Sequence, residues 1–154
     1  MEMPKPTDAH RKLQSLVGTW EAEEKMFPSP WDPKGGTAVG HVNNRLALDG
    51  FAVIQDYEQT SKGAVNYWGH GIFTWDPALQ TYVLYWFDSL GMGVNVFQGT
   101  FEDKKLTMSY KSQQGYTRAS WEFTSDKSYA YKMEISGDGN QWQPMMEGSY
   151  SRIG

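Results

Sequence analysis

HVNNRLALDGFAVIQDYEQT, residues 41–60, places a tight turn, Asp49-Gly50, between two runs in which apolar and polar residues alternate. Alternation with a period of two is typical of strands that bury one face, and Gly accepts the positive φ that a two-residue turn requires. Counting outward from the turn sets Asn44 opposite Gln55 and leaves Tyr57 on the same face. The stretch therefore predicts an antiparallel β-hairpin.

A second tight turn, Lys62-Gly63, extends this register to a third strand. Counting from it sets Gln55 beside His70 and Tyr57 beside Trp68. The face that these residues share is otherwise apolar. We therefore expect three polar side chains in the protein interior, those of Asn44, Gln55 and His70.

The same period-two pattern, interrupted by turn signals, continues to the end of the chain and favours an all-β fold over alternating strands and helices. One short N-terminal helix is expected from Thr7-Asp8, which can cap it, to Val17. Short links make neighbouring strands antiparallel, so we predict a ten-stranded antiparallel meander barrel that closes on itself as a single domain, residues 1–154. The expected strands are 18–26, 37–48, 51–60, 64–75, 81–89, 93–102, 105–111, 115–125, 128–136 and 141–152.

Two strands allow either face to point inward. In strand 81–89, a three-residue preceding loop favours an interior set containing Trp86 and Asp88, while a four-residue loop favours Val83, Tyr85 and Phe87. We favour the first set. In strand 115–125, a two-residue turn points Arg118 and Glu122 inward, whereas a slip of one residue points Ala119, Trp121 and Phe123 inward. The second set avoids the cost of burying an unpaired charge.

The last hairpin, with its turn at Asp138-Gly139, sets Tyr131 opposite Met146 on an aromatic and Met-rich inner face. Pro144 cannot donate a ladder hydrogen bond, so it predicts a bulge or a gap in the final strand.

The amino-acid composition excludes several classes of function. The 154 residues contain no Cys, which removes thiol catalysis and Cys-type zinc sites and suits a reducing compartment, so we expect a cytoplasmic protein with no metal. The net charge of −4 is dispersed, so no basic footprint for nucleic acid is present. No stretch approaches the roughly 18 apolar residues of a membrane helix. Aromatic residues reach 15%, which predicts an interior built largely from rings.

The run from Leu16 to Trp20, which closes the predicted helix and opens the first strand, resembles the Gly-x-Trp signature of the calycin superfamily of lipocalins and fatty-acid-binding proteins. Further residues resemble a bacterial domain family of unknown function within that superfamily: Tyr82 to Trp86, Asp88-Ser89, Gly99, Glu147, Tyr150 and Arg152. The resemblance implies a barrel closed at one end by the helix, with structural roles for Gly18, Trp20 and Arg152. It places the Arg152 guanidinium over the Trp20 ring.

Nitrobindins, haem-binding barrels of similar size and fold, hold the haem iron with a His near the C-terminus. All three His of this sequence lie before Thr81, so a haem would need His70 or a Met as its ligand. We therefore expect no cofactor.

The interpretation that these residues favour is a barrel that binds a small hydrophobic or aromatic molecule, because ten strands leave interior space. The ligand-binding residues are expected to be Asn44, Gln55, Tyr57, Trp68, His70, Trp86, Asp88, Arg118 and Tyr131. One alternative is a small lyase or isomerase that uses His70 with Asp88 or Glu122. Another is an interaction module, such as a homodimer, which exposed Tyr85 and Phe87 would favour.

Overall fold

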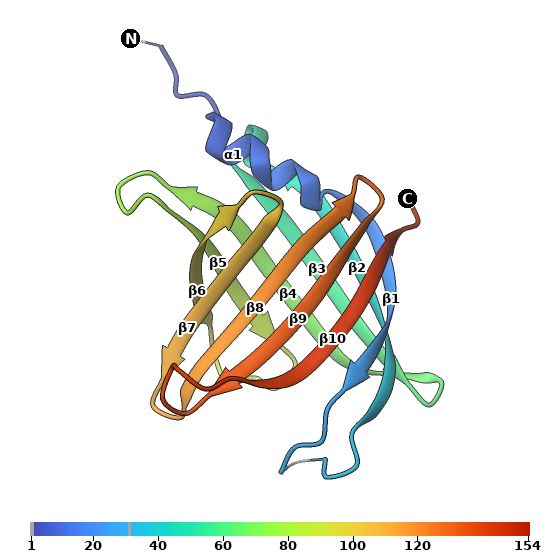
Figure 1. Cartoon of the computed structure of the whole chain (residues 1–154). Helices are drawn as coiled ribbons and strands as arrows, with labels where there is room; N and C mark the ends of the chain where they lie inside the picture. The colour runs from blue at the N-terminus through green and yellow to red at the C-terminus, as the bar shows by residue number, and fades with distance from the viewer. Residues whose placement is uncertain (1, 31) are drawn as a thin grey trace.

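The computed structural model describes residues 2–30 and 32–154 and confirms a closed barrel of ten antiparallel strands (Figure 1). Each strand pairs with its neighbours in sequence, and the first strand pairs with the last. The strands are β1 (Gly18–Met26), β2 (Gly36–Ala47), β3 (Ala52–Ser61), β4 (Ala64–Asp76), β5 (Thr81–Asp88), β6 (Asn95–Glu102), β7 (Lys105–Ser112), β8 (Gly115–Ser125), β9 (Ser128–Ser136) and β10 (Gln143–Arg152).

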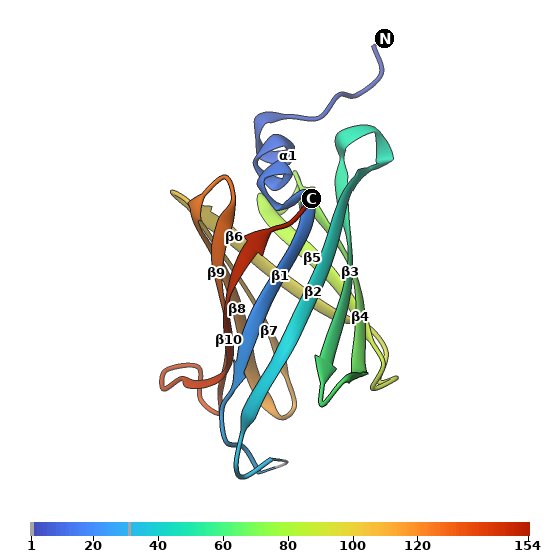
Figure 2. The ribbon, with the colours of Figure 1, turned by 90° about the vertical axis from the view of Figure 1, so that its right-hand side faces the viewer.

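The predicted N-terminal helix is present as α1 (Asp8–Lys12), which continues as a 3-10 turn over Leu13–Leu16. It lies across one end of the barrel, near both chain termini (Figures 1 and 2). We call the opposite end the open end. Among the described residues, no helix has the length and apolar character needed to cross a membrane.

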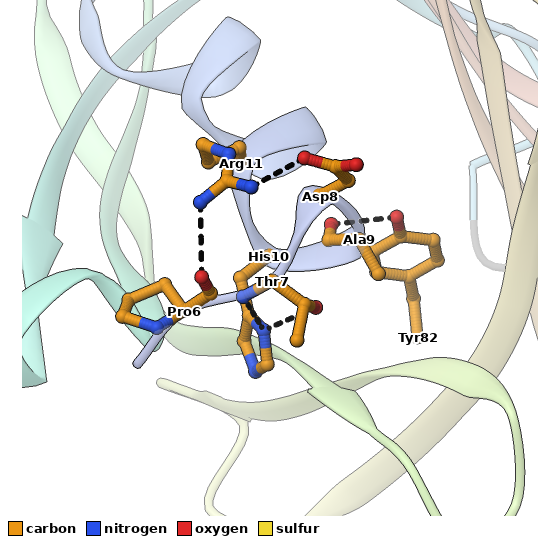
Figure 3. A network of polar contacts seen from close by, with 7 residues as sticks. All are labelled: Pro6, Thr7, Asp8, Ala9, His10, Arg11 and Tyr82. Atoms are coloured by element: carbon orange, nitrogen blue, oxygen red, sulfur yellow. Dashed lines mark hydrogen bonds and ion pairs between the residues drawn. The ribbon is translucent and has the colours of Figure 1, made fainter. Parts of the chain in front are cut away.

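Contacts of α1 hold it on the barrel. His10 is buried, and its Nδ1 accepts a hydrogen bond from the Thr7 backbone N–H at 3.0 Å. The Tyr82 hydroxyl on β5 donates to the Ala9 carbonyl at 2.7 Å, which ties the helix to the sheet (Figure 3). The His10 ring also meets the Phe51 ring edge-on, with centroids 4.9 Å apart. Helix and barrel therefore form one unit.

The structural roles implied for Gly18, Trp20 and Arg152 agree with their geometry. Trp20 is fully buried, and the Arg152 guanidinium carbon lies 4.2 Å from the centre of its ring. Arg152 also donates to the backbone carbonyls of Val17 and Asp126. A Cβ on Gly18 would collide with the Arg152 guanidinium, so only Gly leaves room for this contact.

Inward-facing side chains pack into a dry core at the α1 end. They come from most strands and from the 3-10 turn, and they are almost fully buried: Leu13, Leu16, Trp20, Val53, Phe73, Leu84, Leu106, Met108, Trp121 and Tyr129. Aromatic rings dominate this set and meet largely edge-on, as Phe73 and Trp121 do at 5.5 Å. This end of the barrel is therefore closed.

The register of the first hairpin is as predicted, with Asn44 opposite Gln55 and Val42 opposite Tyr57. The register of the second hairpin is not. A shift between Gln59 and Thr60 leaves one extra residue, Asn66, on β4. Because neighbouring strand residues point to opposite faces, one extra residue reverses every side chain that follows.

The predictions that His70 and Trp68 face the interior are therefore wrong. His70 lies opposite Asp56 and Trp68 opposite Glu58, all on the outer face, and Trp68 is 49% exposed. In their place, Tyr67, Gly69, Gly71 and Phe73 face inward.

The structure settles the phases of the two undecided strands. Trp86 and Asp88 face inward, as we favoured, while Tyr85 and Phe87 are exposed. On β8 the inward set is Ala119, Trp121 and Phe123, so Arg118 and Glu122 lie outside.

The final hairpin contains the bulge that Pro144 predicted. The register shifts between Pro144 and Met146, so that Met146 lies opposite Met133 and not opposite Tyr131 as expected. Tyr131 still faces inward, beside Trp121, at a ring-centre distance of 5.3 Å.

Candidate functional site

The lumen contains a carboxylate that is completely buried, that of Glu24 on β1. The Tyr57 hydroxyl lies 2.6 and 2.8 Å from its two oxygens, and the Tyr150 hydroxyl donates to Oε2 at 2.5 Å. The Gln59 amide donates to Oε1 at 3.3 Å. All three donors are neutral, and hydrogen bonds of this kind are what a buried carboxylate needs to offset the loss of water.

Small residues surround Glu24 and make room for this network. Gly148 and Ala38 lie directly opposite Glu24 on the two neighbouring strands. A Cβ on Gly40 would overlap both the Tyr150 hydroxyl and the Glu24 carboxyl group. The cluster is therefore built into the sequence of three strands.

Burial, followed by the nearby charge of Glu24, raises the pKa of the Tyr57 and Tyr150 hydroxyls above the usual range. Both hydroxyls consequently stay protonated and act as donors. The carboxylate oxygens are engaged by these donors, so Glu24 positions the tyrosines and does not itself offer a free acceptor.

Sequence reasoning missed Glu24. A signal was present, because Trp20, Ala22 and Glu24 alternate along one strand and Trp20 marks the inner face. The three donors come from β3 and β10, and local sequence does not show that side chains of these two strands come together at Glu24.

A second polar cluster lies nearer the open end. The Asp88 carboxylate accepts hydrogen bonds from the Tyr67 hydroxyl at 2.8 Å and the Trp86 indole N–H at 3.2 Å, both on Oδ2. The Trp86 ring lies over Gly69 and Gly71, where any Cβ would overlap it. These glycines allow an indole to lie flat against the barrel wall.

Asn44 and Gln55 face the lumen, as predicted. The Asn44 amide donates to the Leu16 carbonyl at 2.8 Å, which leaves its Oδ1 buried without a hydrogen-bond partner among the described residues. Buried polar atoms are almost always paired, so an orphan acceptor indicates a place for a water or a ligand donor.

Several inward-facing side chains toward the open end keep part of their surface exposed. This half-buried set contains Gln59, Tyr67, Trp86, Asp88, Tyr110, Tyr131 and Met133. Such surface borders space inside the barrel or at its open end. The inner wall is therefore not completely covered by neighbouring side chains here.

The Tyr131 hydroxyl is a further polar group in this region. Burial, followed by the charge of Glu24, raises its pKa, so it stays protonated. The atoms available to a guest in the lumen are thus neutral hydroxyl and amide groups together with the Asp88 carboxylate.

The remaining predicted site residues lie on the outer surface. His70 Nδ1 is 2.7 Å from Asp56 Oδ1, both exposed to solvent. Arg118 pairs with Glu134 at 3.0 Å and lies 4.0 Å over the Trp142 ring.

The enzyme alternative therefore loses its acid–base pair. His70 and Asp88 face opposite sides of the barrel wall, and Glu122 is exposed on the outer face of β8. Among the described residues, no group of three or more His, Asp or Glu side chains could hold a metal ion.

Two hollows lie outside the lumen. One is a groove of about 470 Å³ on the outer face of β3, β4 and β5, with Trp68, His70 and Phe87 among its lining residues. The other, of about 320 Å³, lies between α1 and the sheet near Trp75 and Phe101.

Comparisons with known proteins agree with the architecture. The model of a family described as "Protein of unknown function (DUF1579)" matches residues 5–152. A search of curated proteins finds no match.

Two solved structures share the fold. Rv2717c from M. tuberculosis superposes with a TM-score of 0.70 at 11% identity, over 96% of this chain and 99% of that chain. The S-type phycobiliprotein lyase CPES from Guillardia theta superposes with a TM-score of 0.64 at 8% identity, over 97% and 99%.

Proposed function

The chain belongs to the DUF1579 family, and we propose that its barrel binds a small, mainly apolar, ring-bearing molecule in the lumen, which enters through the open end. The observation that carries the proposal is the half-buried state of inward-facing aromatic side chains at that end, Tyr67, Trp86, Tyr110 and Tyr131. Aromatic walls with a few placed polar groups are typical of small-molecule sites.

The wall chemistry supports a ring-bearing ligand. Trp86 packs over Gly69 and Gly71 and keeps part of its surface exposed, which a planar guest could stack on. Tyr131 and Asp88 supply polar atoms on either side of the lumen, and the unpaired Oδ1 of Asn44 supplies an acceptor deeper in the barrel. A ligand that carries one or two N–H or O–H donors suits this arrangement.

The Glu24 cluster serves the same site as a positioning device. Its hydrogen bonds hold Tyr57 and Tyr150 in fixed orientations in the lumen. A rigid wall lowers the entropy lost when a ligand binds.

The likeness to a phycobiliprotein lyase supports only the general idea that such a barrel can serve a small-molecule function, because at 8% identity it establishes the fold alone. Purification of the protein followed by native mass spectrometry tests directly which ligand this chain binds. A noncovalent mass adduct that copurifies would identify it.

A binding assay with the probe 1-anilinonaphthalene-8-sulfonate, a planar aromatic molecule, tests the location. We expect Trp86→Leu to weaken probe binding about five- to thirtyfold, which corresponds to about 1–2 kcal/mol of lost stacking. Trp68→Leu is the matched control, because Trp68 is the outward-facing Trp nearest in the sheet.

The two variants separate the lumen from the outer groove. Loss of binding in Trp86→Leu with little change in Trp68→Leu supports the lumen. The reverse pattern would move the site to the groove beside His70 and overturn the proposal. Far-UV circular dichroism of both variants establishes that the barrel is intact.

A further inference from the structure

The outer surface of β4, β5, β6 and the β5–β6 link carries a continuous group of exposed apolar side chains. We call it the apolar face. Its members are Trp68 (49% exposed), Tyr85, Phe87, Leu90, Met92 (82% exposed), Val94 and Val96. Tyr85 lies directly opposite Val96, and the Ser89 N–H donates to the Trp68 carbonyl, so these residues are neighbours in the sheet.

This clustering differs from the scattered apolar residues that any surface carries. Taken together, these side chains expose on the order of 700–800 Å² of surface, above the largest patch of about 300–600 Å² on a typical monomer. The area also matches the roughly 800 Å² that each partner buries in a standard interface.

The apolar face contains both a depression and a projection. The depression is the groove of about 470 Å³ above Gly69, flanked by Trp68 and Phe87. The projection is the link between β5 and β6, in which Leu90 and Met92 are largely exposed. A flexible Met side chain adapts readily to an irregular apolar groove.

A surface that carries a projection and a matching depression can pack on a second copy of itself. A twofold axis that lies in the interface, midway between the two features, brings each projection onto the other copy's depression at the same time. The backbone of a closed barrel has no free strand edge, so the contact must form between side chains on the sheet faces.

The chemistry of the groove favours the uncharged segment of a second copy as its occupant. Beside its apolar side chains, the groove is also lined by Asp56, Glu58 and His70, whose side chains face outward, so a segment that enters it must bring no further negative charge. The Leu90–Met92 segment meets this condition, because it contains no charged residue.

We propose that this protein forms a twofold homodimer through the apolar face, with the Leu90–Met92 segment of each copy seated in the groove beside Trp68 and Phe87 of the other. The inference is independent of the lumen site.

The test is the molar mass in solution across a dilution series, by sedimentation equilibrium of the full chain. We expect a mass twice the 17.5 kDa of one chain, which falls toward one chain on dilution. Met92→Glu and Phe87→Glu should each raise the dissociation constant at least about tenfold, because they place a buried unpaired charge in the interface.

Val39→Glu is the matched control, since Val39 is an exposed outward-facing residue on β2 with the same change in charge. It should leave the dissociation constant within about twofold of the wild-type value. Circular dichroism of each variant establishes folding, and two separate variants guard against the failure of one.

Three results would overturn the inference. The first is a monomer at every concentration up to about 1 mM, which would leave the apolar face to a different partner. The second is a dimer unaffected by both substitutions. The third is a dimer that Val39→Glu disrupts as strongly, which would place the interface elsewhere on the barrel.

Discussion

Replacing the buried carboxylate by an apolar side chain of similar size, Glu24→Leu, tests whether the lumen network stabilises the barrel. The substitution leaves the Tyr57 and Tyr150 hydroxyls without their acceptor in a buried setting. Each unpaired buried hydroxyl costs about 1–3 kcal/mol. Part of this loss is offset because the variant no longer has to bury the Glu24 charge. We expect a net loss of about 3 kcal/mol in the free energy of unfolding.

The companion variant removes both hydroxyls as well. Glu24→Leu with Tyr57→Phe and Tyr150→Phe has no orphan hydroxyl, and the Gln59 amide, which also loses its acceptors, is partly exposed and can bond to water, so the stability of this variant should return to within about 1 kcal/mol of the wild-type value. Glu23→Leu, on the solvent side of the same strand, is the control and should change stability by less than about 0.5 kcal/mol.

Urea unfolding followed by tryptophan fluorescence measures these differences, and thermal melts should show a fall of about 6–12 °C for Glu24→Leu alone. A single variant as stable as the wild type would refute the reasoning. So would a triple variant that fails to recover, because the cost would then not lie in the orphaned hydroxyls.

Two further predictions concern the α1 end. Burial, followed by the charge of Arg11, lowers the pKa of His10 below 6.5, so its stabilising contribution is present above pH 6.5 and is lost as the pH falls through the lowered value. His10→Phe keeps a ring against Phe51 but has no group that titrates. Between about pH 7.5 and about pH 5, the free energy of unfolding of this variant, measured in urea titrations, should fall less than that of the wild type. Equal losses in the two proteins would contradict this prediction. Gly18 has a φ of 139°, and a Cβ there would overlap the Arg152 guanidinium, so Gly18→Ala should lower the stability by more than about 2 kcal/mol in thermal melts. A Cβ on Gly137 would meet open space, so the control Gly137→Ala should change the stability by less than about 0.5 kcal/mol. Equal effects of the two substitutions would exclude the steric explanation.

Local sequence was sufficient for the architecture. Turn glycines and period-two alternation predicted ten antiparallel strands, and the first hairpin has the register counted from Asp49-Gly50. The resemblance carried by Gly18-x-Trp20 implied a barrel closed at one end by the helix, and α1 lies across one end. These features depend on interactions between residues that are near one another in the chain.

Side-chain direction was predicted less well, because a single extra residue reverses it. The extra residue Asn66 turned His70 and Trp68 outward, and a shift between Phe123 and Ser125 accompanies the outward direction of Arg118. Pro144 marks the bulge in β10, whereas no residue near Asn66 marks the one in β4. The packing supplies the reason: Gly69 and Gly71 must face inward to make room for Trp86.

The alternation of Trp20, Ala22 and Glu24 indicates the direction of the lumen carboxylate, but the groups that make its burial possible lie on other strands. Its donors Tyr57 and Tyr150 lie 33 and 126 residues away in sequence. An isolated Glu in a strand is normally a solvent-facing residue, because burying its charge costs several kcal/mol. Only the assembled barrel shows that hydrogen bonds from Tyr57 and Tyr150 offset the cost of burying the Glu24 carboxylate.

Closure between β1 and β10 has a consequence for synthesis in the cell. β1 leaves the ribosome before the other nine strands of the barrel and its partner β10 after them, so one edge of β1 stays unpaired until the whole barrel has been synthesised. A nascent chain with an open strand edge is prone to associate with its neighbours. Ribosomal stalling or premature termination before residue 143 should therefore yield aggregates, even though most of the barrel would already have been made.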